Sequence, residues 1–183
     1  MSEFEPTSHT VTWEGKVIQA GTESYRYDDG AEATHDRIWH PGAVSMLPVD
    51  DQYVWLVRQP REAAGLAHSL EIPAGKRDRP GEPILDLAKR ELVEEVGKQA
   101  GEWREILSFY PTPGFSDEEL WIFLATDLSD VPGGATPDAD ERLEIVPWPL
   151  VDLDGALAQT QDAKTLIGLM WLARQPFASA NAS

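Results

Sequence analysis

The sequence contains no cysteine, and its other absences also narrow the range of possible functions. Without cysteine the chain has no disulfide, no thiolate nucleophile and no Cys-ligated zinc, which is compatible with the cytoplasmic location that we expect. No apolar run approaches the length of a membrane span, so we expect no membrane partner. The N-terminus lacks a basic region followed by an apolar one, and this predicts no signal peptide.

Positive charge is also scarce. Fifteen Lys and Arg stand against 32 Asp and Glu, which gives a formal net charge of −17 at pH 7. Such a charge argues against a nucleic-acid backbone or an anionic membrane as the main partner. An anionic substrate would have to be bound through metal ions and local arginines. The four histidines show no spacing typical of metal ligands, and we interpret them as structural or exposed.

What the chain does contain suits one domain, or one domain with a small appendage, in 183 residues, of which 42% are apolar and seven are Trp that can build a core. The patterns predict strands over residues 11–20, 25–39, 43–49, 53–58, 103–110, 120–125 and 143–146, and helices over 83–97, 151–159 and 163–174. Gly21 and the turn signal Asp28-Asp29-Gly30 break the first two segments. This order predicts an α/β fold, an α/β/α sandwich with a mixed sheet, preceded by a small N-terminal β region. We expect that β region over residues 1–40, the main domain over 41–177 and a flexible tail over 178–183.

The helix predicted over residues 83–97 has acidic residues near its C-terminal end, where a helix disfavours them. Glu91, Glu94 and Glu95 lie in its last turns, before a glycine that suits the C-terminal cap. The macrodipole is negative there and disfavours each carboxylate by up to about 1 kcal/mol. A solvated charged face would produce the same pattern. A bound divalent cation would relieve the repulsion, and oxygen-only ligands indicate Mg²⁺ or Mn²⁺.

The residues around this helix form a spaced motif: Gly75, six residues, Glu82, seven residues, then Arg90-Glu91-Leu92-Val93-Glu94-Glu95-Val96-Gly97. It resembles the Nudix box, Gly-x5-Glu-x7-Arg-Glu-U-x-Glu-Glu-x-Gly-U, in which U is apolar. Two positions depart from that form. The first spacing is one residue longer, which we expect to lengthen the loop over residues 76–80 without moving the helix. The final apolar position holds Lys98, past the predicted helix end.

Three further segments, residues 57–61, 70–75 and 113–118, resemble the ADP-ribose pyrophosphatase branch of that family, as does a late acidic loop over 138–144. The resemblance implies hydrolysis of ADP-ribose to AMP and ribose 5-phosphate with Mg²⁺ or Mn²⁺. In this branch the N-terminal region commonly forms part of a dimer interface. We therefore expect a homodimer, with residues 1–40 as its dimerisation element.

The resemblance also implies roles for residues of the box. Glu91, Glu95 and the carbonyl of Ala74 match metal ligands, and Glu94 matches a further ligand or a base. Arg90 is expected to pair with Glu82 or Glu94 and so to join helix and loop. Glu82 itself is interpreted as a loop-stabilising charge. The general base is expected in the late acidic loop, where Glu141 is the best match and Glu144 and Glu118 are the alternatives.

Substrate contacts are expected from three places. Arg58 and Arg61 follow a buried strand and are expected to clamp phosphates, although simple surface pairing would also explain them. Glu71 is expected to accept hydrogen bonds from a ribose or an adenine amino group. The turn Gly114-Phe115-Ser116, with Glu118 after it, is expected to cover the terminal ribose; a buried structural Phe115 is the alternative.

Two other functions remain open from the sequence. The chain could hydrolyse another nucleoside diphosphate derivative, because substrate choice in this family lies in loops. It could also be a non-catalytic sensor that binds ADP-ribose, against which the intact acids of the box argue. If the chain were an acidic interaction domain without a ligand, the spacing of the motif residues from Gly75 to Gly97 would be unexplained.

Overall fold

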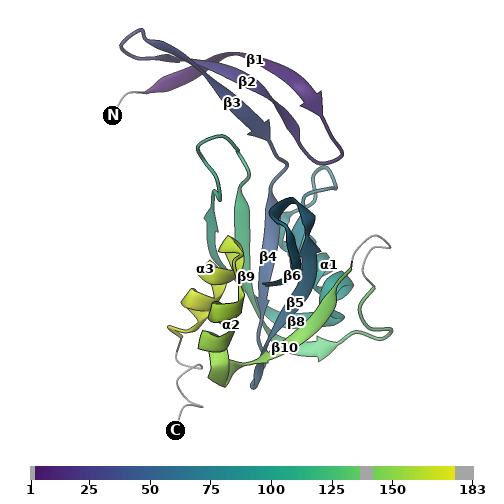
Figure 1. Cartoon of the computed structure of the whole chain (residues 1–183). Helices are drawn as coiled ribbons and strands as arrows, with labels where there is room; N and C mark the ends of the chain where they lie inside the picture. The colour runs from purple at the N-terminus through teal and green to yellow at the C-terminus, as the bar shows by residue number, and fades with distance from the viewer. Residues whose placement is uncertain (1–2, 137–141, 176–183) are drawn as a thin grey trace. The chain divides into compact units, whose positions relative to one another are not determined.

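The computed structural model describes residues 3–136 and 142–175, which form two compact units (Figure 1). The predicted tail over 178–183 lies outside the described residues. The first unit comprises Met1–Gly42 and Phe109–Leu120, and the second comprises Ala43–Ser108 and Trp121–Ser183. The segment Phe109–Leu120 therefore belongs with the N-terminal strands, although it is far from them in sequence. None of the helices in the described ranges combines the length and the hydropathy that a membrane-spanning helix requires.

The first unit is a three-stranded antiparallel sheet in the order β1-β2-β3. Its strands are β1 (Phe4–Glu14), β2 (Gln19–Tyr27) and β3 (Glu32–Trp39). The expectation that Gly21 interrupts a strand is wrong, because Gly21 lies inside β2. A Cβ there would lie 1.9 Å from the Thr10 carbonyl oxygen, so glycine permits close approach of β1 instead. The chain turns between Gly15 and Ile18, within the predicted strand over residues 11–20.

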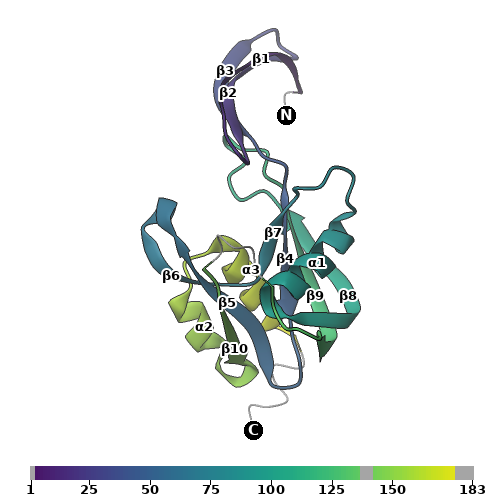
Figure 2. The ribbon, with the colours of Figure 1, turned by 90° about the vertical axis from the view of Figure 1, so that its right-hand side faces the viewer.

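The second unit holds two sheets, in the orders β10-β5-β6 and β7-β4-β9-β8 (Figure 2). The strands are β4 (Ala43–Pro48), β5 (Tyr53–Arg61), β6 (Leu66–Glu71), β7 (Ala74–Lys76), β8 (Lys98–Phe109), β9 (Leu120–Asp130) and β10 (Glu144–Pro149). The helices are α1 (Ile84–Val96), α2 (Leu153–Gln159) and α3 (Ala163–Leu172), with the 3-10 turns η1 (Glu62–Ala64) and η2 (Leu150–Asp152). The predicted helix over residues 83–97 is confirmed to within one residue at each end.

Helices cover both faces of this unit. The apolar stripe of α1 packs on the strands in a core of Val44, Met46, Val57, Leu87, Ala88, Leu92, Val96, Phe123 and Ala125. On the other side α3 approaches the sheet so closely that a Cβ on Gly168 would lie 3.3 Å from the Leu47 side chain and 3.4 Å from that of Ile72. Because Met46 and Leu47 are neighbours on β4, they face opposite layers. The predicted α/β/α sandwich is confirmed.

Strand β8 begins five residues earlier than predicted, directly after the C-terminal cap of α1. Gly97 adopts φ 70°, the left-handed conformation that ends the helix. Lys98 follows as the first residue of β8 and is buried, with Nζ 3.8 Å from the Trp55 ring centroid and 2.7 Å from Asp130 Oδ1. The lysine stem therefore fills the apolar position of the motif while its charge is held by a ring and a carboxylate.

Candidate active site

The acidic end of α1 lies against β7, where the glycine of the motif makes room for a carboxylate. A Cβ on Gly75 would lie 2.1 Å from Cδ and 2.4 Å from Oε1 of Glu91, far inside van der Waals contact. Only glycine therefore allows this approach. Glu95, four residues along the helix, accepts a hydrogen bond of 3.0 Å from the Ala74 N–H. Both carboxylates are buried where β7 begins.

Arg90 joins the helix to the preceding loop. Its Nη1 donates to Glu91 Oε1 at 2.9 Å and to Glu94 Oε2 at 3.0 Å. Its Nε and Nη2 donate to Glu82 at 3.2 and 3.1 Å, and Nη2 also donates to Asp78 at 2.8 Å. These contacts raise the pKa of Arg90, the hydrogen bonds to Glu82 contributing most. Both expected partners, Glu82 and Glu94, are thus bound by the same guanidinium.

The donor set suits a hard divalent cation. Glu91, Glu94, Glu95 and the backbone at Ala74 offer oxygen ligands only, which is the chemistry that Mg²⁺ and Mn²⁺ prefer. The Gly75 cradle brings the Glu91 carboxylate to β7, and Glu95 is tied to Ala74 on the same strand. In the part of the chain that the structure describes, no three acidic or imidazole side chains converge as a ready-made metal cage. A cation here would compete with Arg90 for Glu91 and Glu94.

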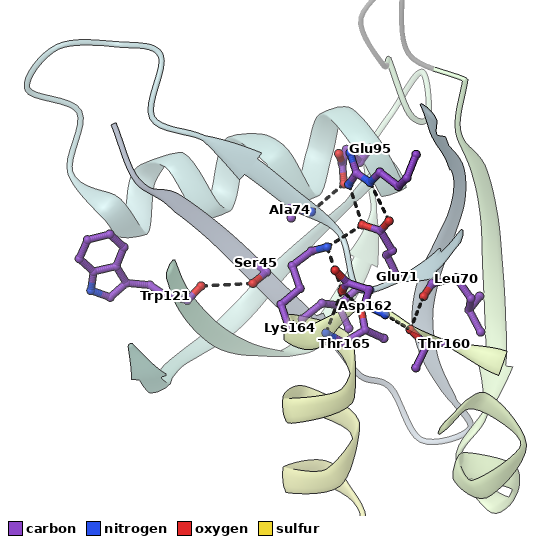
Figure 3. A network of polar contacts seen from close by, with 12 residues as sticks. Ser45, Leu70, Glu71, Ala74, Glu95, Trp121, Thr160, Asp162, Lys164 and Thr165 are labelled. Carbon is purple, nitrogen blue, oxygen red and sulfur yellow. Dashed lines mark hydrogen bonds and ion pairs between the residues drawn. The ribbon is translucent and has the colours of Figure 1, made fainter. Parts of the chain in front are cut away.

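A second polar cluster surrounds Glu71 at the end of β6 (Figure 3). The Glu71 side chain is 1% exposed and accepts from Arg61 Nε at 2.7 Å and Arg61 Nη2 at 2.6 Å. Lys164 Nζ, on α3, donates to the same carboxylate at 2.6 Å. Burial alone would raise the pKa of Glu71, but its hydrogen bonds and charge interactions with Arg61 and Lys164 lower that pKa to about 2. Glu71 is therefore an ionised anchor for two cations.

The start of α3 holds the segment between β6 and β7. Asp162 caps the helix, and its Oδ2 accepts from the Thr165 N–H at 3.0 Å and from the Thr165 hydroxyl at 2.5 Å. The same hydroxyl oxygen accepts from the Ile72 N–H at 2.8 Å. Figure 3 shows Asp162, Lys164 and Thr165 gathered beside Glu71. One helical turn thus contacts both Glu71 and Ile72.

The two arginines expected to act together line different cavities. Arg61 borders a cavity of about 470 Å³, together with Glu71, Asp162 and Ser69. Arg58 borders another of about 780 Å³, which His68 and Arg142 also line, and it lies 3.5 Å from Glu144. The two arginines lie three residues apart on β5, and a register shift interrupts that strand between Gln59 and Arg61. Glu144, one of the two alternative bases, is therefore engaged in an ion pair with Arg58.

Four of the expected substrate-binding residues, Gly114, Phe115, Ser116 and Glu118, belong to the first unit. There the Phe115 carbonyl accepts a hydrogen bond of 2.7 Å from the Ile38 N–H, and Phe115 is 51% exposed, so it is not a core residue. The Ser116 hydroxyl accepts from the Glu118 N–H at 3.2 Å. A Glu118 carboxylate oxygen lies 3.9 Å from His40 Nδ1. The preferred base, Glu141, lies outside the described residues.

Lys164 and Thr165 were missed from the sequence. Both belong to a helix recognised by its apolar spacing, and no local pattern indicated that this lysine is buried. Their partners, Glu71 and Ile72, lie 93 residues earlier. The available signal was Asp162, a typical N-cap residue, which would have predicted where the helix begins but not what it contacts.

Comparison with known proteins identifies the family of this chain. A model of the NUDIX domain matches residues 39–168. The ADP-ribose pyrophosphatase of Bacillus subtilis (strain 168) is 36% identical over 164 residues, which cover 86% of each chain. The methanol dehydrogenase activator of Bacillus methanolicus is 30% identical over 168 residues, 88% of each chain. A crystal structure of an ADP compounds hydrolase shares the fold, with a TM-score of 0.80 and 21% identity over 99% of this chain and 97% of the other. The chain therefore belongs to the Nudix family of pyrophosphohydrolases, which generally use a divalent metal and act on nucleoside diphosphate derivatives.

Proposed function

We propose that this chain hydrolyses ADP-ribose to AMP and ribose 5-phosphate with a bound divalent cation. The observation that carries the proposal is the placement of Glu91 and Glu95 against β7, one in the cradle of Gly75 and one on the Ala74 N–H. The likeness to a relative named ADP-ribose pyrophosphatase over 86% of the chain supports the choice of substrate. In this reaction water supplies the new P–O bond, and the bond from one phosphorus to the bridging oxygen breaks.

The residues of the box and one later glutamate divide three roles in this proposal. The carbonyl of Ala74 and the carboxylates of Glu91, Glu94 and Glu95 would hold Mg²⁺ or Mn²⁺. When bound, the cation neutralises charge on the diphosphate and lowers the pKa of water. Arg90 holds the carboxylates in place before the cation arrives. Glu141 accepts the proton of the attacking water.

The substrate is oriented by the remaining candidates. Arg61, with a side chain 45% exposed at the 470 Å³ cavity, binds phosphate oxygens, while Glu71 fixes its guanidinium through two hydrogen bonds. Arg58 contributes a second positive charge from the neighbouring cavity. In the first unit, Phe115 is exposed, and this ring, together with Gly114, Ser116 and Glu118, is suited to contact with a ribose.

We also propose that the chain forms a homodimer through residues 1–40 and acts in the cytoplasm. Support for the dimer comes from β1, which is exposed along its whole length, including Phe4 and Trp13. A three-stranded sheet with so much exposed apolar surface gains stability from a partner. Light scattering coupled to gel filtration would give the mass. A monomer at micromolar concentration would contradict this part of the proposal.

The test of the main proposal is product release from a panel of ADP-ribose, sugar nucleotides and dinucleotides with Mg²⁺. Release of AMP from ADP-ribose at the highest kcat/KM supports the proposal. Faster cleavage of another member would favour the second candidate, a hydrolase of other nucleoside diphosphate derivatives. A relative from Escherichia coli (strain K12), named ADP compounds hydrolase, is 29% identical over 130 residues and supports that candidate. Tight binding of ADP-ribose without turnover would instead indicate a sensor.

A further inference from the structure

Lys164 is a buried lysine outside the Nudix box. It is 8% exposed, and its Nζ lies 2.6 Å from Glu71 Oε2 and 2.9 Å from Asp162 Oδ2. Burying an ammonium group is unfavourable unless anions compensate it, so its position is closely defined by these two carboxylates. An apolar residue would fill the same space on α3 without that requirement. Packing alone therefore does not explain why a charged residue occupies this position.

The explanation lies in the carboxylate that Lys164 shares with Arg61. Glu71 Oε2 accepts from both Lys164 Nζ and Arg61 Nη2, each at 2.6 Å, while Oε1 accepts from Arg61 Nε. Arg61 borders the 470 Å³ cavity and Lys164 is not among the residues that line it. Glu71 thus connects a buried cation to one that a ligand can reach.

We propose that Lys164 is a positioning residue, which through Glu71 fixes the guanidinium of Arg61 for an anionic substrate. This inference rests on the proposed hydrolysis of a nucleoside diphosphate derivative. Arg61, Lys164, Glu71 and Asp162 together carry no net charge. Without Lys164 the cluster would carry one negative charge beside the phosphate groups. It would also lose one of the donors that orient the Glu71 carboxylate.

The first turn of α3 strengthens this arrangement. Thr165 is held by Asp162 and in turn holds the Ile72 N–H, so the helix contacts two consecutive residues at the end of β6. Movement of Glu71 relative to α3 would have to break both sets of bonds. The orientation of Arg61 therefore depends on a helix that contributes no residue to the Nudix box.

The test compares Lys164→Met with Lys89→Met, which removes the same charge from an exposed position on α1. We expect Lys164→Met to raise KM about tenfold, with kcat within about threefold, because a misoriented Arg61 guanidinium would bind the anion less tightly in the ground state and the transition state alike. Lys89→Met keeps both parameters. In the Arg61→Ala background, Lys164→Met should lower kcat/KM no further, since it acts through Arg61. A full additional tenfold loss in that background would overturn the inference, as would an unchanged KM in the single variant.

A second pair of measurements separates positioning from stability. Removing one partner of a buried ion pair is destabilising, so Lys164→Met is also combined with Glu71→Gln, which removes the excess negative charge that Lys164→Met leaves in the cluster. The double variant should regain thermal stability while its KM stays raised, because Arg61 has lost its carboxylate. Recovery of KM together with stability would show a structural role alone and overturn the inference.

The position of Arg61 can also be followed without any substrate. The Nε–H resonance of Arg61, identified by its loss in Arg61→Lys, should exchange slowly with water in the unsubstituted protein and rapidly in Lys164→Met. An unchanged exchange rate would overturn the inference even if no hydrolysis were detected. Failure of the unsubstituted protein to cleave any member of the panel would overturn the proposed function instead, so the two failures are distinguishable.

Discussion

Gly75→Ala offers a direct test of the site, because the structure shows what the added methyl group would meet. Its Cβ would lie 2.1, 2.2 and 2.4 Å from Cδ, Cγ and Oε1 of Glu91. The carboxylate would have to move by roughly 1 Å or more to regain ordinary contact, and a misplacement of that size costs about a hundredfold in rate. Glu91 cannot simply turn away, since it is buried and bound by Arg90. We expect kcat to fall about a hundredfold, equivalent to about 2.7 kcal/mol of transition-state stabilisation.

The assay is AMP release over a series of Mg²⁺ concentrations, and the half-saturating concentration should rise as kcat falls. Gly75 is not among the glycines with positive φ, so alanine meets no backbone strain there. The matched control is Gly168→Ala, also at a buried glycine, where the nearest atoms lie at 3.3 Å and a small adjustment suffices. The control should keep kcat within about twofold. Unchanged kcat and Mg²⁺ dependence in Gly75→Ala would refute the assignment of Glu91 as a metal ligand.

Three further predictions follow from the site. Glu95→Gln should lower kcat at least about a hundredfold with an unchanged circular dichroism spectrum, and a chelator should abolish activity reversibly until Mg²⁺ is restored. The pKa of Glu71 is lowered from 4.5 to about 2. Ionised Glu71 therefore contributes about 3 kcal/mol to the free energy of unfolding, a contribution that is complete above pH 4.5 and lost as the pH falls through 2. Urea titrations at several pH values should show that the stability of Glu71→Gln depends less steeply on acid pH. Glu141→Gln should lower kcat about a thousandfold and flatten the acidic limb of the pH profile of kcat. Glu144→Gln, at a residue paired with Arg58, should keep kcat within about threefold. Equal losses of kcat in both variants would contradict the choice of Glu141 as the base.

The helix of the box was predictable because its signals are local. Proline before the first turn, apolar residues at helical spacing and a glycine that takes φ 70° at the end all act within one segment. The pairing of Arg90 with Glu94, four residues along the same helix, was predictable for the same reason. Short-range geometry thus accounts for the part of the site on α1.

Contacts between distant segments were not predictable in this way. Lys164 meets Glu71 only because α3 packs on the sheet beside the end of β6. The register shift in β5 between Gln59 and Arg61 interrupts the alternation of side chains, and nothing in the sequence indicates it. Gly21 was misread for a related reason, since a glycine that allows a neighbouring strand to approach looks the same in sequence as one that ends a strand.

The contacts of Arg90 affect how the protein would bind a divalent cation. One guanidinium donates to four carboxylates, those of Asp78, Glu82, Glu91 and Glu94, and so offsets part of their mutual repulsion from within the chain. The acidic helix end can therefore be assembled during folding without help from an ion. A divalent ion that bound to Glu91 and Glu94 would therefore replace the Arg90 guanidinium as their counter-charge. Folding of the chain and binding of a cation to these carboxylates would then be two separate equilibria.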